Sequence, residues 1–331
     1  MKHSPSHSYR NTIKKTPSLK KFKAGQCHFI LKAKDRLILS PYKSGILIDE
    51  LRKIFMKLYC IFKKETDCIR TCVFMDKCPY SILFETYSPP GESKYTDWLE
   101  EVPLPFVIEP LWEDKASYQV DEPFEFRLIL IGKALEYLPY FILAFKELGH
   151  LGIGSEKKHF ELLKVFDSDR EVIYDQETGI IKSSKAVKQC ENPEEYYDRN
   201  ILALRFQTPT RIHYQDKLVI QPEFHVLIRE LLRRIEVLSY LYWHKKLQWN
   251  KSYYVSEAEK ISIKMSNLEW TDWEPIASGE ESEFKLGGFT GDIVYSGNIL
   301  PFLPILLIGQ EVHIGELCTL GLGKYEMKTL L

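Results

Sequence analysis

The residues best suited to chemistry in this sequence form a glycine-rich block near its end. The block reads Gly-Glu-Leu-Cys-Thr-Leu-Gly-Leu-Gly-Lys-Tyr from Gly315 to Tyr325, and His313 stands two residues before it. Glycines allow positive φ and a close approach of the backbone to a bulky polyanion, and successive amide groups in such a turn form an anion-binding concavity. Lys324 adds a cation. We therefore expect the block to contact phosphate groups; tight packing of a loop against a helix is the alternative that needs no ligand.

Histidine is the side chain whose unperturbed pKa, about 6.5, suits proton transfer near neutral pH. Among the nine histidines, His313 is the leading candidate because it precedes the glycine-rich block. Its neighbours Val312 and Ile314 are equally typical of a buried, hydrogen-bonded position. His28 in the first predicted strand and His150 in an earlier glycine-rich turn are reserve candidates.

Cysteines form a second cluster. Four of the seven lie within nineteen residues, at Cys60, Cys68, Cys72 and Cys78. Four thiolates can hold a zinc ion tetrahedrally in a structural site, whereas independent buried thiols behave as small hydrophobes and hold no metal. The spacing predicts a structural zinc site that takes no part in catalysis, with independent thiols as the alternative.

Hydrophobic periodicity predicts the elements that position these residues. In the first half of the chain, alternating and helical patterns follow the order strand, helix, strand, strand, helix, strand. The predicted elements are a strand over 27–39, a helix over 43–62, strands over 105–108 and 124–131, a helix over 135–148 and a strand over 160–166. This order is typical of a ferredoxin-like unit.

The second half repeats the pattern. The predicted elements are a strand over 201–206 closed by Thr208-Pro209, a helix over 224–242, strands over 261–276 and 284–296, a helix over 300–308 and a strand over 324–327. Leu-Pro-Tyr-Phe at 138–141 resembles Leu-Pro-Phe-Leu at 300–303, and Leu-Gly-Ile-Gly at 151–154 resembles Leu-Gly-Leu-Gly at 320–323. A duplication explains two matches in the same order. We predict an α+β protein with two tandem ferredoxin-like (RRM-like, βαββαβ) domains over 24–168 and 200–331, joined by a hairpin and linker over 169–199.

The charge of the chain is unevenly distributed. The 331 residues carry 45 Lys and Arg against 46 Asp and Glu, but residues 1–23 contain seven basic side chains and no acid. We expect these residues to form a basic, flexible arm. Hydrophobic residues make up 44% of the chain, which excludes disorder of the whole. The odd cysteine count and the lack of a secretory signal or membrane-spanning segment predict a cytoplasmic protein with no membrane partner.

Four motifs in the second half together resemble a known family. They are Gly-Phe-Thr-Gly at 288–291, Pro-Phe-Leu-Pro at 301–304, His-Ile-Gly at 313–315 and Thr-Leu-Gly-Leu-Gly-Lys-Tyr at 319–325. In this order they resemble the C-terminal domain of the CRISPR-associated endoribonucleases of the RAMP superfamily, which process precursor crRNA. The first half is also similar, through 102–106, 130–132 and 148–154.

The resemblance implies a function and a reaction. It implies binding of CRISPR repeat RNA and metal-independent cleavage of precursor crRNA, in which the 2′-hydroxyl attacks the adjacent phosphate to leave a 2′,3′-cyclic phosphate and a 5′-hydroxyl. Other subunits of a CRISPR interference complex are further expected partners, and the protein is expected to be a monomer or weak homodimer. Two alternatives stay open: a non-catalytic RNA-binding subunit of such a complex, and a zinc-stabilised interaction module without RNA.

The resemblance also assigns roles to residues. In some relatives the catalytic histidine lies on the first helix, but the segment 43–62 contains none, which leaves Tyr42 close to that helix. The catalytic candidates are therefore His313, Lys324, His28 and Tyr42. The RNA-binding candidates are Gly315, Thr319, Gly321, Gly323, Lys324, Tyr325, Arg229 and Arg233.

Overall fold

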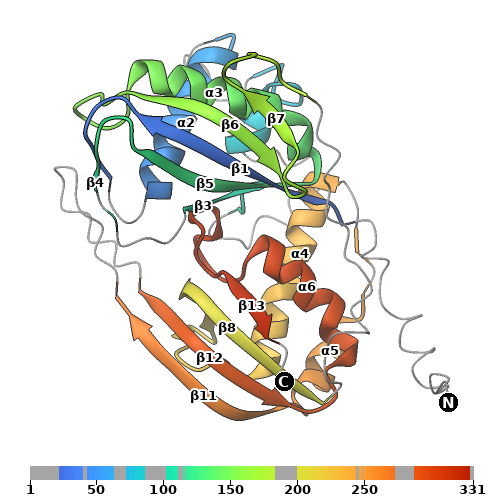
Figure 1. Ribbon diagram of the computed structural model, residues 1–331. Coiled ribbons are helices and arrows are strands. Elements are labelled where there is room, and N and C mark those ends of the chain that lie inside the picture. Colours follow the sequence, from blue (N-terminus) through green and yellow to red (C-terminus); the bar gives the residue numbers. More distant parts are fainter. Residues whose placement is uncertain are drawn as a thin grey trace, which may run out of the picture.

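The computed structural model describes residues 22–39, 43–62, 72–85, 102–110, 115, 117–182, 200–243, 246–247, 249–272 and 287–328. These residues form two α+β domains, each with an antiparallel sheet covered by helices on one face (Figure 1). Both domains have the ferredoxin-like order of strands and helices, so the predicted fold class is confirmed. No helix in the described part of the chain is both long and apolar enough to cross a membrane.

The N-terminal domain has a five-stranded sheet in the order β3-β5-β1-β6-β7. Its elements are β1 (Ala24–Ala33), β2 (Leu37–Ile38), α2 (Lys43–Tyr59), η2 (Ser81–Glu85), β3 (Phe106–Pro110), β4 (Ser117–Tyr118), β5 (Pro123–Ile131), η4 (Gly132–Tyr137), α3 (Leu138–Leu151), β6 (Phe160–Asp167) and β7 (Val172–Asp175). Alternating residues of β1, including Phe29 and Leu31, are buried beneath α2 and α3. The opposite face of the same strands carries polar residues, as expected for a sheet with one covered face.

The C-terminal domain has a four-stranded sheet in the order β11-β12-β8-β13. Its elements are β8 (Ile201–Thr210), β9 (His213–Tyr214), β10 (Lys217–Leu218), α4 (Phe224–Trp243), α5 (Lys251–Ala258), β11 (Ser262–Thr271), β12 (Gly288–Ser296), η6 (Leu300–Phe302), α6 (Leu303–Val312), η7 (Cys318–Leu320) and β13 (Tyr325–Lys328). The helices α4, α5 and α6 lie on one side of this sheet (Figure 1).

The structure differs from the sequence prediction at several boundaries. The strand β8 continues through Thr208-Pro209 to Thr210, because the ladder between β8 and β12 shifts register between Phe289 and Gly291. Such an irregularity accommodates a proline, which cannot donate to a regular ladder. Part of the predicted linker, β7, pairs with β6 as the fifth strand of the N-terminal sheet. The helix α5 was not expected, and Phe22 of the predicted arm is buried against Trp243.

The N-terminal sheet packs on the helices of the C-terminal domain. Val107 of β3 and Ile129 and Ile131 of β5 belong to the same buried cluster as the apolar residues of α4 and α6. In Figure 1 these two helices lie directly beneath the N-terminal sheet. One end of the polar face of that sheet is therefore an interface between the domains.

This shared core predicts that the two domains stabilise each other. Replacing buried Ile129 by alanine should lower the free energy of unfolding by about 2–5 kcal/mol, because it leaves a cavity between the domains. Urea unfolding followed by tryptophan fluorescence measures the change. The exposed Ile38 of the same domain is the matched control, since Ile38→Ala should change stability by less than about 0.5 kcal/mol. Equal effects of the two substitutions would contradict the shared core.

Candidate functional site

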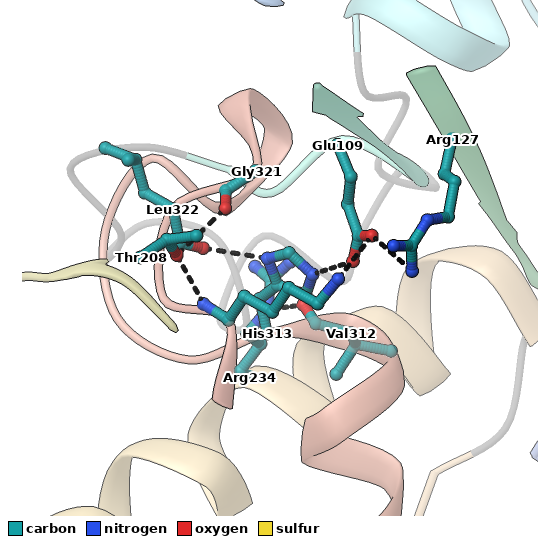
Figure 2. Close-up of polar contacts among 9 residues, drawn as sticks. Glu109, Arg127, Thr208, Arg234, Val312, His313, Gly321 and Leu322 are labelled. Carbon is teal, nitrogen blue, oxygen red and sulfur yellow. Dashed lines mark hydrogen bonds and ion pairs between the residues drawn. The ribbon is translucent and has the colours of Figure 1, made fainter. Parts of the chain in front are cut away.

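A buried carboxylate connects the two domains at the glycine-rich block. Glu109 of β3, with its side chain 3% exposed, accepts bonds from His313 Nε2 at 2.7 Å and Lys324 Nζ at 2.8 Å. Arg127 of β5 stands opposite Glu109 in the ladder and places its Nη1 3.5 Å from Glu109 Oε2. Figure 2 shows Glu109 between His313 and Arg127. Residues from both domains thus share one anion.

The cations around Glu109 keep it ionised. Burial alone would raise its pKa, but the hydrogen bonds and charges of His313 and Lys324 outweigh burial and lower the pKa from 4.5 to about 2. Nearby cations favour the charged form of a carboxyl group in this way.

The His313 ring is held by a contact at each of its two nitrogens. Its Nδ1 lies 2.9 Å from the carbonyl oxygen of Leu322, and its Nε2 faces the Glu109 carboxylate. Both ring nitrogens of His313 are therefore occupied by hydrogen-bond partners within the protein. The side chain is 0% exposed. The arrangement favours the hydrogen-bonded core position that the flanking apolar residues indicated.

Side chains of β8 and α4 hold the glycine-rich block and the end of α6 through hydrogen bonds to backbone atoms. Thr208 of β8 donates its hydroxyl to the Gly321 carbonyl at 3.0 Å and accepts from the Lys324 amide at 2.8 Å. Arg234 of α4 donates Nε to the Val312 carbonyl at 2.8 Å, at the end of α6. These contacts, drawn in Figure 2, present the His313 ring and the Lys324 side chain to β3.

The glycines of the block are required by packing. Gly315, Gly321 and Gly323 have φ of 89°, 83° and 72° and are buried. A Cβ at Gly323 would lie 1.8 Å from the Ile314 carbonyl oxygen, and one at Gly321 would lie 2.8 Å from the Ile108 carbonyl oxygen of the N-terminal domain. Close packing accounts for these glycines without a ligand, since Gly321 packs against the N-terminal domain and Gly315 and Gly323 pack against backbone atoms of their own domain.

The other predicted RNA-binding residues differ in solvent exposure. Tyr325 is buried and donates its hydroxyl to the Leu306 carbonyl. Thr319 on η7 is half-buried. Arg229 is exposed, with its guanidinium 5.5 Å from the centre of the Tyr214 ring, whereas Arg233 pairs with Glu230 on the same helix. Arg229 and Thr319 therefore keep surface available for a ligand.

Each half of the chain matches a known family model. The family model described as CRISPR-associated endoribonuclease Cas6 matches residues 204–325, which include the glycine-rich block, and a model described as an N-terminal domain matches residues 22–186. No curated protein matches the chain. Residues 204–325 thus carry a domain of the CRISPR-associated Cas6 endoribonuclease family.

Solved structures show the same fold. A Cas6 product complex is 13% identical, with a TM-score of 0.53 over 92% of this chain and 100% of that chain. A Thermus thermophilus Cas6 is 13% identical, with a TM-score of 0.50 over 93% and 99%. A chain of a partial Cas6-RT-Cas1–Cas2 complex is 17% identical, with a TM-score of 0.54 over 94% of this chain and 46% of that one. The chain thus spans less than half the length of that relative.

The remaining predicted residues lie at separate places in the structure. Tyr42 and Cys68 fall outside the described residues. Ser44, in the first turn of α2, donates its hydroxyl to the Leu320 carbonyl at 2.7 Å and so connects α2 to the block. His150 is exposed in the last turn of α3. Cys60, Cys72 and Cys78 are half-buried free thiols, and the described residues contain no group of three metal-binding side chains. Zinc binding stays a prediction.

His28 lies in the same row of the N-terminal sheet as the Glu109 cluster. The register pairs Glu109 with Arg127 and Arg127 with His28, and directly paired residues of an antiparallel sheet share a face. The His28 side chain is 36% exposed, and its Nε2 lies 2.7 Å from Glu125 Oε2, outside hydrogen-bond alignment. The register therefore places His28 two strands from Glu109, in the same row of the sheet. Glu109 is the carboxylate that bonds to the other two candidates, Lys324 and His313.

The sequence prediction missed Glu109, Arg127 and Arg234. The available signal was a glutamate at the end of the apolar run Phe106-Val107-Ile108, since an acid on a buried strand requires cationic partners. Two of those partners, His313 and Lys324, lie 204 and 215 positions away along the chain.

The low pKa of Glu109 predicts that its contacts with the C-terminal domain weaken in acid. Because the folded-state pKa lies below the ordinary value of 4.5, the stabilisation is complete above pH 4.5 and is lost as pH falls towards 2. Glu109→Gln should cost roughly 3–5 kcal/mol at neutral pH, since it leaves buried cations unpaired. The variant should also lose part of the acid dependence of unfolding. Thermal unfolding between pH 7 and pH 3 measures both effects.

The control is Asp292→Asn, which breaks the exposed pair between Arg205 and Asp292. We expect it to cost at most about 1 kcal/mol, as surface pairs do. A Glu109→Gln variant as stable as Asp292→Asn at pH 7 would show that the carboxylate does not hold the domains together.

Proposed function

We propose that the chain binds CRISPR repeat RNA and cleaves precursor crRNA. The observation that carries the proposal is the match of the Cas6 endoribonuclease family to residues 204–325. This segment contains the glycine-rich block, where Lys324 and the nearby His313 bond to Glu109 of the N-terminal sheet. A named relative in a Cas6-RT-Cas1–Cas2 complex supports other CRISPR proteins as further partners.

The proposed reaction is an internal transfer that needs no metal. The 2′-oxygen forms a bond to the adjacent phosphorus, the bond from phosphorus to the 5′-oxygen breaks, and the products are a 2′,3′-cyclic phosphate and a 5′-hydroxyl. One group must take the 2′-proton and another must deliver a proton to the 5′-oxygen. Cations near the phosphate stabilise the charge that develops in the transition state.

His28 is the histidine whose position best suits proton transfer. It is exposed to solvent in part and lies one strand from Arg127. The Glu125 carboxylate lies beside its Nε2, and an imidazole can both accept and donate a proton near neutral pH. His313, by contrast, is buried with both nitrogens bonded, so we assign it to positioning the block and not to proton transfer.

Lys324 supplies the cation for the phosphate. Its Nζ bonds to Glu109, but the side chain is 16% exposed and so reaches the protein surface where the two domains meet. An ammonium group carries three hydrogens, so Lys324 can bind a phosphate oxygen and Glu109 together.

The reaction is tested by incubating the protein in EDTA with a labelled RNA of its own CRISPR repeat. We expect one discrete product whose 3′ end is a cyclic phosphate, identified by mass spectrometry. A repeat RNA with a single 2′-deoxy nucleotide at the cut should bind equally well and stay intact, because the nucleophile is missing. Binding without any cleavage would instead support the non-catalytic subunit, and a requirement for added metal would contradict the proposed chemistry.

The role of His28 is tested by His28→Ala. We expect cleavage to fall by on the order of 10²- to 10⁴-fold, the range for loss of a general acid or base, while RNA affinity changes little. The matched control is His159→Ala, because His159 is an exposed histidine of the same domain paired with Asp35 at 2.8 Å. Single-turnover rates across pH 5–9 measure the effect. Equal rates for wild type and His28→Ala would remove His28 from the mechanism.

A further inference from the structure

The seam between the domains, made by Glu109, Arg127, Lys324 and Arg234, carries more positive than negative charge. Glu109 is the one acidic side chain bonded to any of these three cations within the described part of the chain. Arg234 is 5% exposed, and its Nη2 is buried without a hydrogen-bond partner among the described residues. Unpaired positive charge is costly to bury, so an excess of this kind indicates a site that is completed by an anion.

Two of the three cations reach the surface. Arg234 is buried, but the Arg127 side chain is 37% exposed and that of Lys324 is partly exposed. Arg127 comes from the N-terminal domain and Lys324 from the C-terminal domain. Both approach the same carboxylate oxygen, Glu109 Oε2, at 3.5 Å and 2.8 Å. The charged groups of Arg127 and Lys324 therefore both face Glu109 Oε2.

Arg127 is incompletely used by this contact. A guanidinium has five donors in a planar fork that matches two oxygens of a phosphate, whereas the contact of Arg127 with Glu109 is a single approach at 3.5 Å. A structural ion pair would be expected to be short and bidentate, as the pair of Arg205 and Asp292 is, with both bonds at 2.7 Å. The donors of Arg127 are thus available to a second anion from the solvent side.

We infer that Arg127 and Lys324 together form a binding site for a single RNA phosphodiester, spanning the two domains and oriented by Glu109. Glu109 holds the two cations at a fixed separation and is itself too deeply buried to meet the RNA. The site rests on the proposed function, and it adds a residue, Arg127, that lies outside the glycine-rich block.

The location fits the chemistry proposed for His28. Arg127 and His28 are directly paired in the ladder between β5 and β1 and share a face of the sheet. Side chains in such pairs lie roughly 5 Å apart at their Cβ atoms. A phosphodiester bound by Arg127 would therefore lie beside the His28 ring, so that the site would position the backbone for cleavage.

The experiment measures binding of the repeat RNA that carries a 2′-deoxy nucleotide at the cut, over a series of salt concentrations. Arg127→Gln should weaken binding by on the order of 10- to 100-fold, the range for one charged hydrogen bond. It should also lower the slope of log affinity against log salt by about 0.7–0.9, the value for one phosphate contact. Arg205→Gln, which removes an exposed arginine of the C-terminal sheet, is the matched control and should change neither quantity.

A double-mutant cycle tests whether the two cations hold the same phosphate. If they do, Arg127→Gln combined with Lys324→Gln should weaken binding clearly less than the product of the two single effects. Lys324→Arg keeps the charge next to Glu109 and should retain most of the affinity. The melting temperature of each variant without RNA separates loss of the site from loss of the fold.

The outcomes distinguish the two proposals. Reduced affinity and slope for Arg127→Gln in a folded protein, with coupling to Lys324→Gln, support the site. Wild-type affinity and slope for folded Arg127→Gln overturn the site alone, and strictly multiplicative effects overturn the single shared phosphate. Failure of the wild-type protein to bind repeat RNA at all overturns the proposed function and the site with it.

Discussion

The buried carboxylate of Glu109 is the constraint on which the arrangement of both domains depends. A buried anion is tolerated only when cations and hydrogen bonds surround it, and here its partners His313 and Lys324 lie in the other domain. The glycine-rich block must therefore come to β3, which requires its glycines to take positive φ and to lie against backbone atoms. The same contact determines which end of the N-terminal sheet is covered by α4 and α6 and which end, including His28, stays open.

The elements of the fold could be predicted from the sequence because their signals are local. Alternation along β1 and helical spacing along α4 are visible within ten to twenty residues, and the recurrence of two motifs revealed the duplication. The exceptions are places where distant partners override a local signal. Thr208-Pro209 is typical of a turn, but β8 continues through it because Thr208 bonds to Gly321 and a register shift accommodates the proline.

The candidate site was only partly predictable, for a related reason. A histidine beside a glycine-rich block is equally compatible with proton transfer and with a structural role, and the difference depends on what each ring nitrogen faces. For His313 the decisive partner is Glu109, 204 positions away along the chain. Motif spacing gives no information about a contact at that separation. The sequence marked the glycines as special positions, and their surroundings show that Gly321 serves packing against the N-terminal domain, whereas Gly315 and Gly323 serve packing within the C-terminal domain.

The distribution of charge completes the argument about partners. The whole chain has a net charge of −1, which by itself would speak against a nucleic-acid ligand. Recognition of a polyanion depends on the local field, however, and low-dielectric surroundings strengthen that field. Arg127 and Lys324 both approach the Glu109 carboxylate at the domain seam, while the exposed Arg205 is neutralised by Asp292. A nearly neutral protein with one concentrated cationic seam should have little affinity for RNA in general. This distribution suits the proposed selection of one repeat RNA, whose shape brings a phosphate to that seam, among many cellular RNAs.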